Sequence, residues 1–173
     1  MRYAETGFDL EVDLTRGNIE RVATDPELTE LYLGGLGTNA KILWDRVPPE
    51  VEPFSPENLL ILGTGLLVGT PAIGCNRTVV STISPQTGLM AFSMMGGFWG
   101  PELKMAGFEA IVVKGKSPIP VYLRIQDSKV EIRAAHHLWW NAPADVQDMI
   151  RSELGDNKIR ILQIGIGGEN LVR

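Results

Sequence analysis

Alternation of apolar and polar residues predicts β-hairpins at three places along the chain. Phe8, Leu10 and Val12 alternate with acidic residues, which is typical of a strand with one buried face. A turn at residues 15–18 and a return strand at residues 19–23 complete the first hairpin. Two more pairs of apolar runs are separated by turn-forming residues and predict two further antiparallel hairpins, at residues 79–83 with 89–94 and 121–125 with 130–133.

Helices are predicted between and after these hairpins. A capping box at residues 24–27 predicts a short helix that ends at Gly34 and Gly35. Thr38 is expected to cap a second helix, and the spacing predicts one buried face that comprises Ala40, Leu43, Trp44 and Val47. Two more helices are predicted, one at residues 100–107 and one that Asn141 caps.

A short, continuous apolar run at residues 59–62 predicts a strand that is buried on both faces. Two more buried strands are predicted at residues 110–113 and 159–164. Because the strands are grouped in hairpins and do not alternate with helices, the order of elements indicates an α+β fold. The last run is followed by a glycine-rich loop, and the sequence stops soon after Leu171 and Val172. We therefore expect residues 1–173 to be the N-terminal domain of a longer chain.

Composition excludes several classes of function. The net charge of -5 argues against a nucleic-acid partner, which requires clustered cations. One cysteine and two histidines cannot form a disulfide framework or an all-cysteine metal site. We expect Cys75 to be buried as a small apolar residue, and His136–His137 to lie in a segment that enters a helix. Gly165–Gly168 is predicted to be a tight loop, since it lacks the third glycine of a dinucleotide fingerprint.

Charge is distributed unevenly along the chain. Among the 44 residues from Asn58 to Pro101, Arg77 is the only charged one. Glycine, serine and proline interrupt this stretch too often for a membrane-spanning helix, so no membrane span is expected. The acidic N-terminus lacks the apolar run of a signal peptide, and we expect a cytoplasmic protein.

Arg77 is the first candidate for a binding residue. An isolated arginine must meet an anion or reach solvent, because an unpaired buried charge is strongly destabilising. An ordinary salt bridge or an exposed position would satisfy it. A bound phosphate group is the alternative, because guanidinium suits phosphate and glycine-rich turns let backbone N–H groups approach an anion. Gly96 and Gly97 follow a predicted strand in the same apolar stretch, as expected near a large cofactor.

Several motifs resemble the aldehyde ferredoxin oxidoreductase family. The resemblance covers nearly the whole chain and is most specific between Gly96 and Lys116. Within the family, residues 37–41, 75–78 and 92–95 look most like the tungsten subunit of class II benzoyl-CoA reductases. Further matching segments are residues 34–37, 43–44, 47–49, 54–58, 69–71, 84–88 and 168–172.

The resemblance implies a fold and a cofactor. The expected fold is a four-layer α-β-β-α sandwich of mainly antiparallel sheets, on which a tungsten or molybdenum bis-pterin cofactor rests. Arg77 is expected to contact pterin phosphate, and Gly96 and Gly97 to allow its close approach. Met94 occupies the position whose backbone carbonyl binds a magnesium ion that bridges the pterin phosphates. The family usually has asparagine there, so a side-chain role is lost at Met94 while the carbonyl contact is retained.

The resemblance also implies what lies outside these residues. An iron–sulfur cluster, the second half of the pterin site and the acid–base residues are expected in later domains of the same chain, so no catalytic residue is assigned here. The whole enzyme is expected to exchange electrons between an aldehyde or an aromatic acyl-CoA and a ferredoxin-like partner, as a homo- or hetero-oligomer. The alternative is a stand-alone binding or assembly module that kept the fold without the cofactor.

Overall fold

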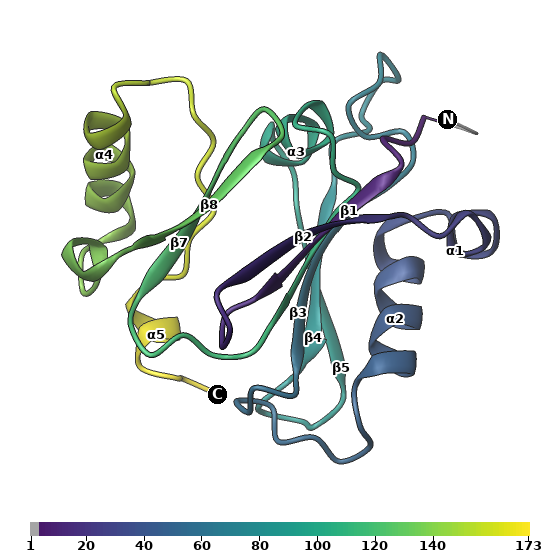
Figure 1. Ribbon diagram of the computed structural model, residues 1–173, viewed down its shortest axis with the longest axis horizontal. Helices are drawn as coiled ribbons and strands as arrows, with labels where there is room; N and C mark the ends of the chain where they lie inside the picture. The colour runs from purple at the N-terminus through teal and green to yellow at the C-terminus, as the bar shows by residue number, and fades with distance from the viewer. Residues whose placement is uncertain (1–3) are drawn as a thin grey trace.

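A six-stranded sheet forms the centre of the computed structural model, which describes residues 4–173 (Figure 1). Its strands lie in the order β2-β1-β6-β3-β4-β5, and a second sheet contains only β7 and β8. Every hairpin that alternation predicted is present. The strands are β1 (Phe8–Asp13), β2 (Asn18–Ala23), β3 (Leu59–Thr64), β4 (Thr78–Ile83), β5 (Met90–Met95), β6 (Ala110–Lys114), β7 (Val121–Gln126) and β8 (Lys129–Ala134).

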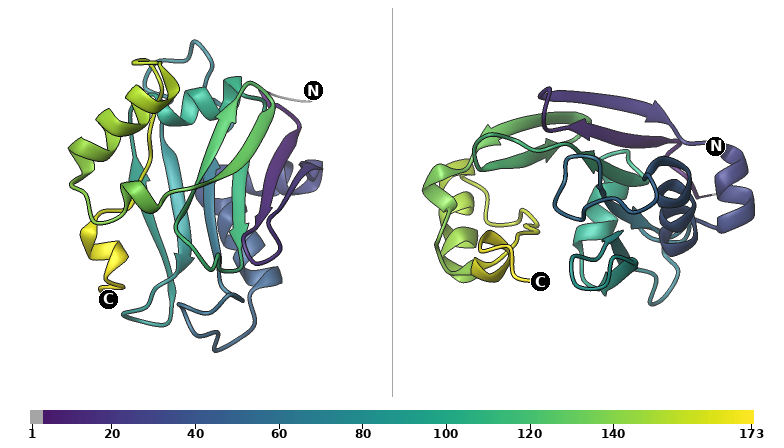
Figure 2. Two further views of the ribbon diagram at one scale, coloured as in Figure 1. Left: turned by 60° about the vertical axis from the view of Figure 1, so that its left-hand side comes forward. Right: turned by 90° about the horizontal axis from the view of Figure 1, so that it is seen from below.

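Helices cover the outer faces of the two sheets. Helix α2 packs against β3, β4 and β5, while α4 lies outside the β7–β8 hairpin at the opposite side of the molecule (Figure 2). The described residues therefore form the expected four layers, in the order α-β-β-α. The helices are α1 (Pro26–Tyr32), α2 (Gly35–Arg46), α3 (Trp99–Met105), the 3-10 turn η1 (His136–Leu138), α4 (Pro143–Leu154) and α5 (Ile166–Glu169).

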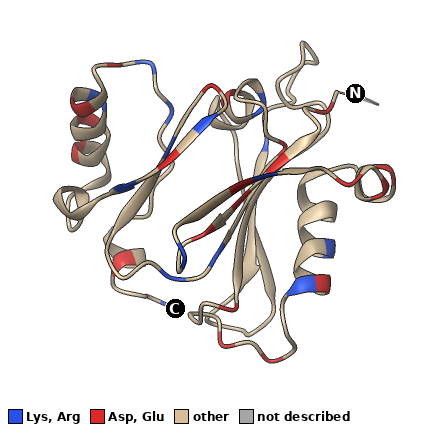
Figure 3. Ribbon diagram, viewed as in Figure 1, with Lys and Arg blue, Asp and Glu red and all other residues tan. Residues whose placement is uncertain are grey.

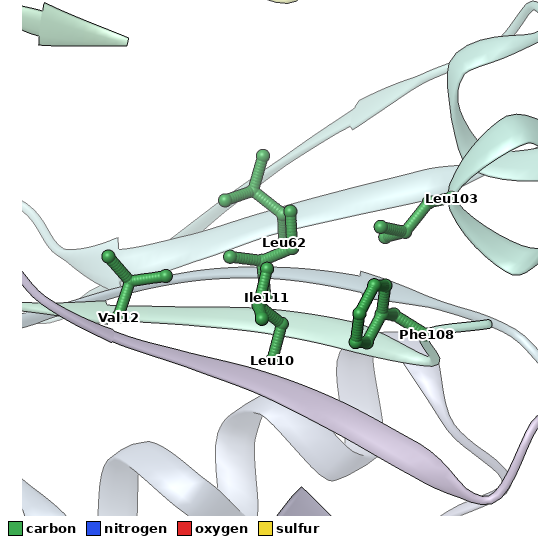
Figure 4. Close-up of a cluster of buried hydrophobic side chains, with 6 residues drawn as sticks. All are labelled: Leu10, Val12, Leu62, Leu103, Phe108 and Ile111. Carbon is green, nitrogen blue, oxygen red and sulfur yellow. The ribbon is translucent and has the colours of Figure 1, made fainter. Parts of the chain in front are cut away.

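The main core lies between the two sheets. Six buried side chains meet there (Figure 4). Apolar residues of β7 and β8, among them Leu123 and Ile132, pack against them. Burial of a large aliphatic or aromatic side chain contributes about 1.5–3 kcal/mol, so this cluster holds the inner layers together. The cluster comprises Leu10, Val12, Leu62, Leu103, Phe108 and Ile111.

One pairing in the central sheet is parallel. Strand β1 pairs with β6 in parallel, with Leu10 opposite Ile111, and β6 pairs with β3 in antiparallel fashion. The N-terminal hairpin is thereby attached to strands that come much later in the chain. All other strand pairs are antiparallel, which confirms the α+β class with mainly antiparallel sheets.

The buried face of α2 differs from the predicted one. Leu43 is buried as expected, but Trp44 is 85% exposed, and Asn39 and Ile42 face the sheet in its place. The helix also begins earlier than predicted, at Gly35, because Gly34 has a φ of 75° and occupies the N-cap position. Thr38 therefore lies within the helix and caps nothing. The helical spacing was right, but the buried stripe runs through Asn39, a polar residue that an apolar pattern does not indicate.

The strand predicted at residues 159–164 is wrong. The segment is extended, but it pairs with no other strand among residues 4–173. Side chains along the segment alternate between two environments: Ile159 and Ile161 pack against α4, while Leu162 and Ile164 remain exposed. An extended segment that packs on a helix can therefore carry the apolar residues that are expected of a strand. Asn141 is also not the N-cap of α4; its side chain donates hydrogen bonds to the carbonyls of His137 and Trp139.

A buried charged cluster anchors the start of the chain. Lys104 Nζ lies 2.6 Å from Glu109 Oε2 and donates a second hydrogen bond to the carbonyl of Ala4 at 3.0 Å. The backbone N–H of Thr6 donates to the other oxygen of Glu109. Asp9 lies nearby, and burial raises its pKa to about 7, with a smaller contribution from the negative charge of Glu109.

Stability should therefore depend on pH through Asp9. Its carboxyl ionises near 3.8 in the unfolded chain and near 7 in the folded one. The stability that the protonated form contributes is complete below pH 3.8 and is lost as pH rises through 7, by up to about 1.4 kcal/mol per pH unit. Thermal unfolding of Asp9→Asn should thus show a smaller loss of stability between pH 5 and pH 8 than the unsubstituted chain. Equal losses in both proteins would contradict this assignment.

Candidate cofactor-binding surface

The end of the β4–β5 hairpin brings three of the predicted site residues together. Thr78 pairs with Met95 in this hairpin, so continuing the register by one residue places Arg77 opposite Gly96. A side-chain carbon built at Gly96 would lie 3.9 Å from Asn76 Oδ1, which confirms that the two segments are adjacent. Gly97 continues this end of the hairpin into α3. Arg77, Gly96 and Gly97 therefore share one edge of the sheet.

Arg77 is exposed and makes no salt bridge or side-chain hydrogen bond with any residue from 4 to 173. Of the two ordinary explanations for an isolated arginine, an exposed position applies and an internal salt bridge does not. Strands β4 and β5 carry no charged residue, so no neighbouring carboxylate on them competes for the guanidinium (Figure 3). Arg77 is thus available to an anion from outside the described residues.

The glycine backbone beside Arg77 is open. Gly97 has a φ of 94°, which favours glycine, and no atom lies within 4 Å of the position that its Cβ would occupy. Met94 lies on β5, the edge strand of the sheet, opposite Val79 of β4. Met94 is 48% exposed. An exposed guanidinium beside an accessible glycine backbone suits a phosphate group, so these residues fit the phosphate end of a pterin cofactor.

A groove lies on the other side of Gly96. It has a volume of about 270 Å³ and separates the end of β5 and the start of α3 from α4 and the extended segment after it. Two arginines, Arg151 and Arg160, line it, and none of its lining residues is acidic. Sequence reasoning missed both arginines. The alternation at residues 159–164 places Arg160 on the exposed side of the segment and could have indicated it.

The other candidates from the sequence do not join this surface. Cys75 is partly exposed and not fully buried as expected, with its Sγ 3.8 Å from the carbonyl oxygen of Ile73. His137 contacts Glu153 at 3.0 Å on the outside of the small sheet. Gly165 precedes the four-residue helix α5, so this segment is a turn and not an extended dinucleotide loop. No cluster of metal-binding side chains occurs among residues 4–173.

Apolar side chains are unusually exposed around this edge. Phe92 on β5 is 54% exposed, Phe98 at the start of α3 is 66% exposed, and Ile73 is fully exposed. Soluble chains seldom present several large apolar side chains together unless another surface covers them. Strands β4 and β5 carry no charged side chain that could surround these apolar residues.

The 173-residue chain by itself should therefore bind a hydrophobic dye and self-associate. We expect enhanced fluorescence of anilinonaphthalene sulfonate, and light scattering above that of a monomer, because the exposed side chains lose contact with water on association. Phe92→Thr should reduce both signals, whereas Trp44→Thr on the far side of α2 serves as the control for a generic exposed aromatic. A clean monomer without dye binding would contradict this expectation.

No helix among the described residues is long and apolar enough to cross a membrane.

The family model for the aldehyde ferredoxin oxidoreductase N-terminal domain matches residues 9–173. The tungsten-containing aldehyde ferredoxin oxidoreductase of Pyrococcus furiosus is 42% identical over 99% of this chain and 28% of its own length. The aliphatic sulfonate oxidoreductase WOR-like subunit of the same organism is 33% identical, over 99% of this chain and 30% of its own length.

A solved structure gives a higher similarity. The active site complex BamBC of benzoyl coenzyme A reductase, in complex with 1,5-dienoyl-CoA, superposes with a TM-score of 0.96. Its sequence is 68% identical, over 98% of this chain and 26% of that one. The chain spans between a quarter and a third of the length of these relatives. The sequence match and the four-layer fold agree, and the chain belongs to the aldehyde ferredoxin oxidoreductase family of tungsten enzymes, of which it forms the N-terminal domain.

Proposed function

We propose that this domain forms the base on which an oxidoreductase binds a tungsten or molybdenum bis-pterin cofactor. The observation that carries the proposal is Arg77, an exposed cation that directly precedes the uncharged strand β4, in the segment beside Gly96. The tungsten-containing relatives support the identity of the cofactor. When bound, such a cofactor supplies the electron-transfer chemistry, and this domain supplies binding and orientation.

Each residue of the site has a defined part in this proposal. Arg77 neutralises the charge of a pterin phosphate, and its planar guanidinium can donate two parallel hydrogen bonds to it. Gly96 and Gly97 let the backbone approach the phosphate without a steric barrier from side chains. The backbone carbonyl of Met94 would be the ligand from this domain to a magnesium ion at the phosphate groups, since hard divalent cations prefer oxygen ligands.

The whole enzyme extends beyond this domain. We place an iron–sulfur cluster and the acid–base residues in later domains of the same chain, and assign a ferredoxin-type protein or subunit as the electron partner in a cytoplasmic oligomer. The substrate that we favour is an aromatic acyl-CoA. The 68% identity to the benzoyl coenzyme A reductase complex supports it, compared with 42% to the aldehyde enzyme. An aldehyde is the second candidate.

The test is metal and pterin analysis of the parent enzyme from anaerobic culture. Tungsten or molybdenum, together with pterin released on denaturation, is expected in stoichiometric amounts. Arg77→Gln should lower the pterin content severalfold, because a charged hydrogen bond contributes about 1.5–3 kcal/mol. Arg16→Gln, at an exposed turn far from the site, should leave it unchanged. A parent protein without either metal and without pterin would refute the proposal and favour a module that has lost its cofactor.

A further inference from the structure

We propose that the groove beside Gly96 is a second anion subsite, in which Arg160 and Arg151 bind a phosphate group of a large organic ligand. The inference rests on the proposed function, because it extends the same cofactor-binding surface to the opposite side of Gly96. It assigns a binding role to the extended segment 159–162, which has no sheet partner within residues 4–173.

Arg160 is held ready for an anion. Its guanidinium stacks over the ring of Phe98, with the central carbon 4.9 Å from the ring centroid. A cation–π contact of this kind holds the guanidinium beside the ring while its N–H donors can still reach a phosphate oxygen. No carboxylate in the described part of the chain forms a salt bridge with Arg160. The aromatic ring therefore positions a cation whose counter-ion lies outside these residues.

Arg151 provides a second, incompletely satisfied cation. Its terminal nitrogens contact Gln147 at 3.3 Å and the exposed carboxylate of Asp148 at 3.6 Å. Its Nε is buried and has no hydrogen-bond partner among the described residues. A buried polar atom without a partner is destabilising, and such atoms often mark a missing ligand or water. Two guanidinium groups therefore line the groove, and Arg151 keeps one donor without a partner among the described residues.

The remaining walls of the groove define the class of ligand. Met95, Trp99, Ile161 and Leu162 supply apolar surface beside the two arginines. The volume of about 270 Å³ exceeds what a free phosphate ion needs and approaches the lower range of small-molecule sites. A phosphate that is attached to a flat or aliphatic organic body matches both properties. The pterin cofactor and the coenzyme A part of a thioester substrate are the two sources of this chemistry.

Full-length parent enzyme with Arg160→Gln tests the assignment. Pterin and tungsten content per chain and the KM for benzoyl-CoA are measured for this variant, for Arg151→Gln and for the control Arg16→Gln. The KM for S-benzoyl-pantetheine, which lacks the nucleotide phosphates, is measured in parallel. Arg160→Lys keeps the charge and should recover part of any loss. Loss of one charged hydrogen bond corresponds to roughly a tenfold change in binding.

The outcomes separate the two sources. A severalfold loss of pterin in Arg160→Gln, but not in Arg16→Gln, assigns the groove to the cofactor. Unchanged pterin with a roughly tenfold higher KM for benzoyl-CoA, and no change for S-benzoyl-pantetheine, assigns it to the substrate. Unchanged values for both would overturn the inference, even if the variant unfolds more easily. A wild-type enzyme without pterin would refute the proposed function instead, which keeps the two failures distinct.

Discussion

Lys104→Met is expected to destabilise the folded chain by about 3–5 kcal/mol, because it leaves the carboxylate of Glu109 buried without its partner. The side chains of Lys104 and Glu109 are only 5% and 10% exposed, and Nζ lies 2.6 Å from Oε2. The substitution also removes the hydrogen bond to the carbonyl of Ala4. Chemical unfolding, followed by circular dichroism, should show the midpoint at a clearly lower denaturant concentration.

Two controls separate this effect from a general loss of charge. Lys41→Met breaks an exposed ion pair with Asp45 on α2 and should leave the unfolding midpoint nearly unchanged. The double variant Lys104→Met with Glu109→Leu should recover much of the loss, because neither charge then remains buried alone. If the double variant were as unstable as Lys104→Met, packing and not the unpaired charge would be the cause.

Gly63→Ala should destabilise the chain by about 3 kcal/mol. The new methyl group would overlap Oδ1 of Asn39, which is fully buried on α2. Overpacking typically costs about 1–3 kcal/mol. Displacing Asn39 would also break its hydrogen bonds to the carbonyl of Val79 and to Ser81 Oγ, at about 1 kcal/mol each. Thermal unfolding should show a melting temperature that is roughly 6–12 °C lower.

Gly65→Ala is the matched control, two residues further along the same segment. Its Cβ would meet no atom within 4 Å, and its φ is not positive. This variant should be neutral or slightly stabilising, because alanine reduces the freedom of the unfolded chain. A similar loss of stability in both variants would mean that the contact between Gly63 and Asn39 is not the cause.

The hairpins could be predicted because each depends on residues close in sequence. The turn at residues 84–88, for example, forms local hydrogen bonds between Ser84 and both Gly88 and Leu89. The order of strands in the central sheet could not be predicted in this way. The parallel pairing of β1 with β6 joins residues about a hundred positions apart, and no local pattern specifies it. The four layers were expected only from the family resemblance, and the fold confirms them.

The candidate site was predictable to a similar extent. Arg77 stood out because it is the only charge in a long apolar stretch, and the structure places it opposite Gly96. Arg160 was missed because the apolar residues of its segment were attributed to a buried strand. Its relation to Phe98 is a tertiary contact between distant parts of the chain. The roles of Arg77, Met94, Gly96 and Gly97 in cofactor binding stay predictions.

The parallel pairing of β1 with β6 also has a consequence for synthesis on the ribosome. The β1–β2 hairpin emerges first, but its inner edge has no partner until residues 110–114 have left the exit tunnel. Unpaired strand edges are sites of misassociation, and pairing across long loops is slow. The open edge of β1 is thus exposed for most of the translation of this domain. Chaperone binding during that interval should concentrate on β1, whose apolar face carries Leu10 and Val12.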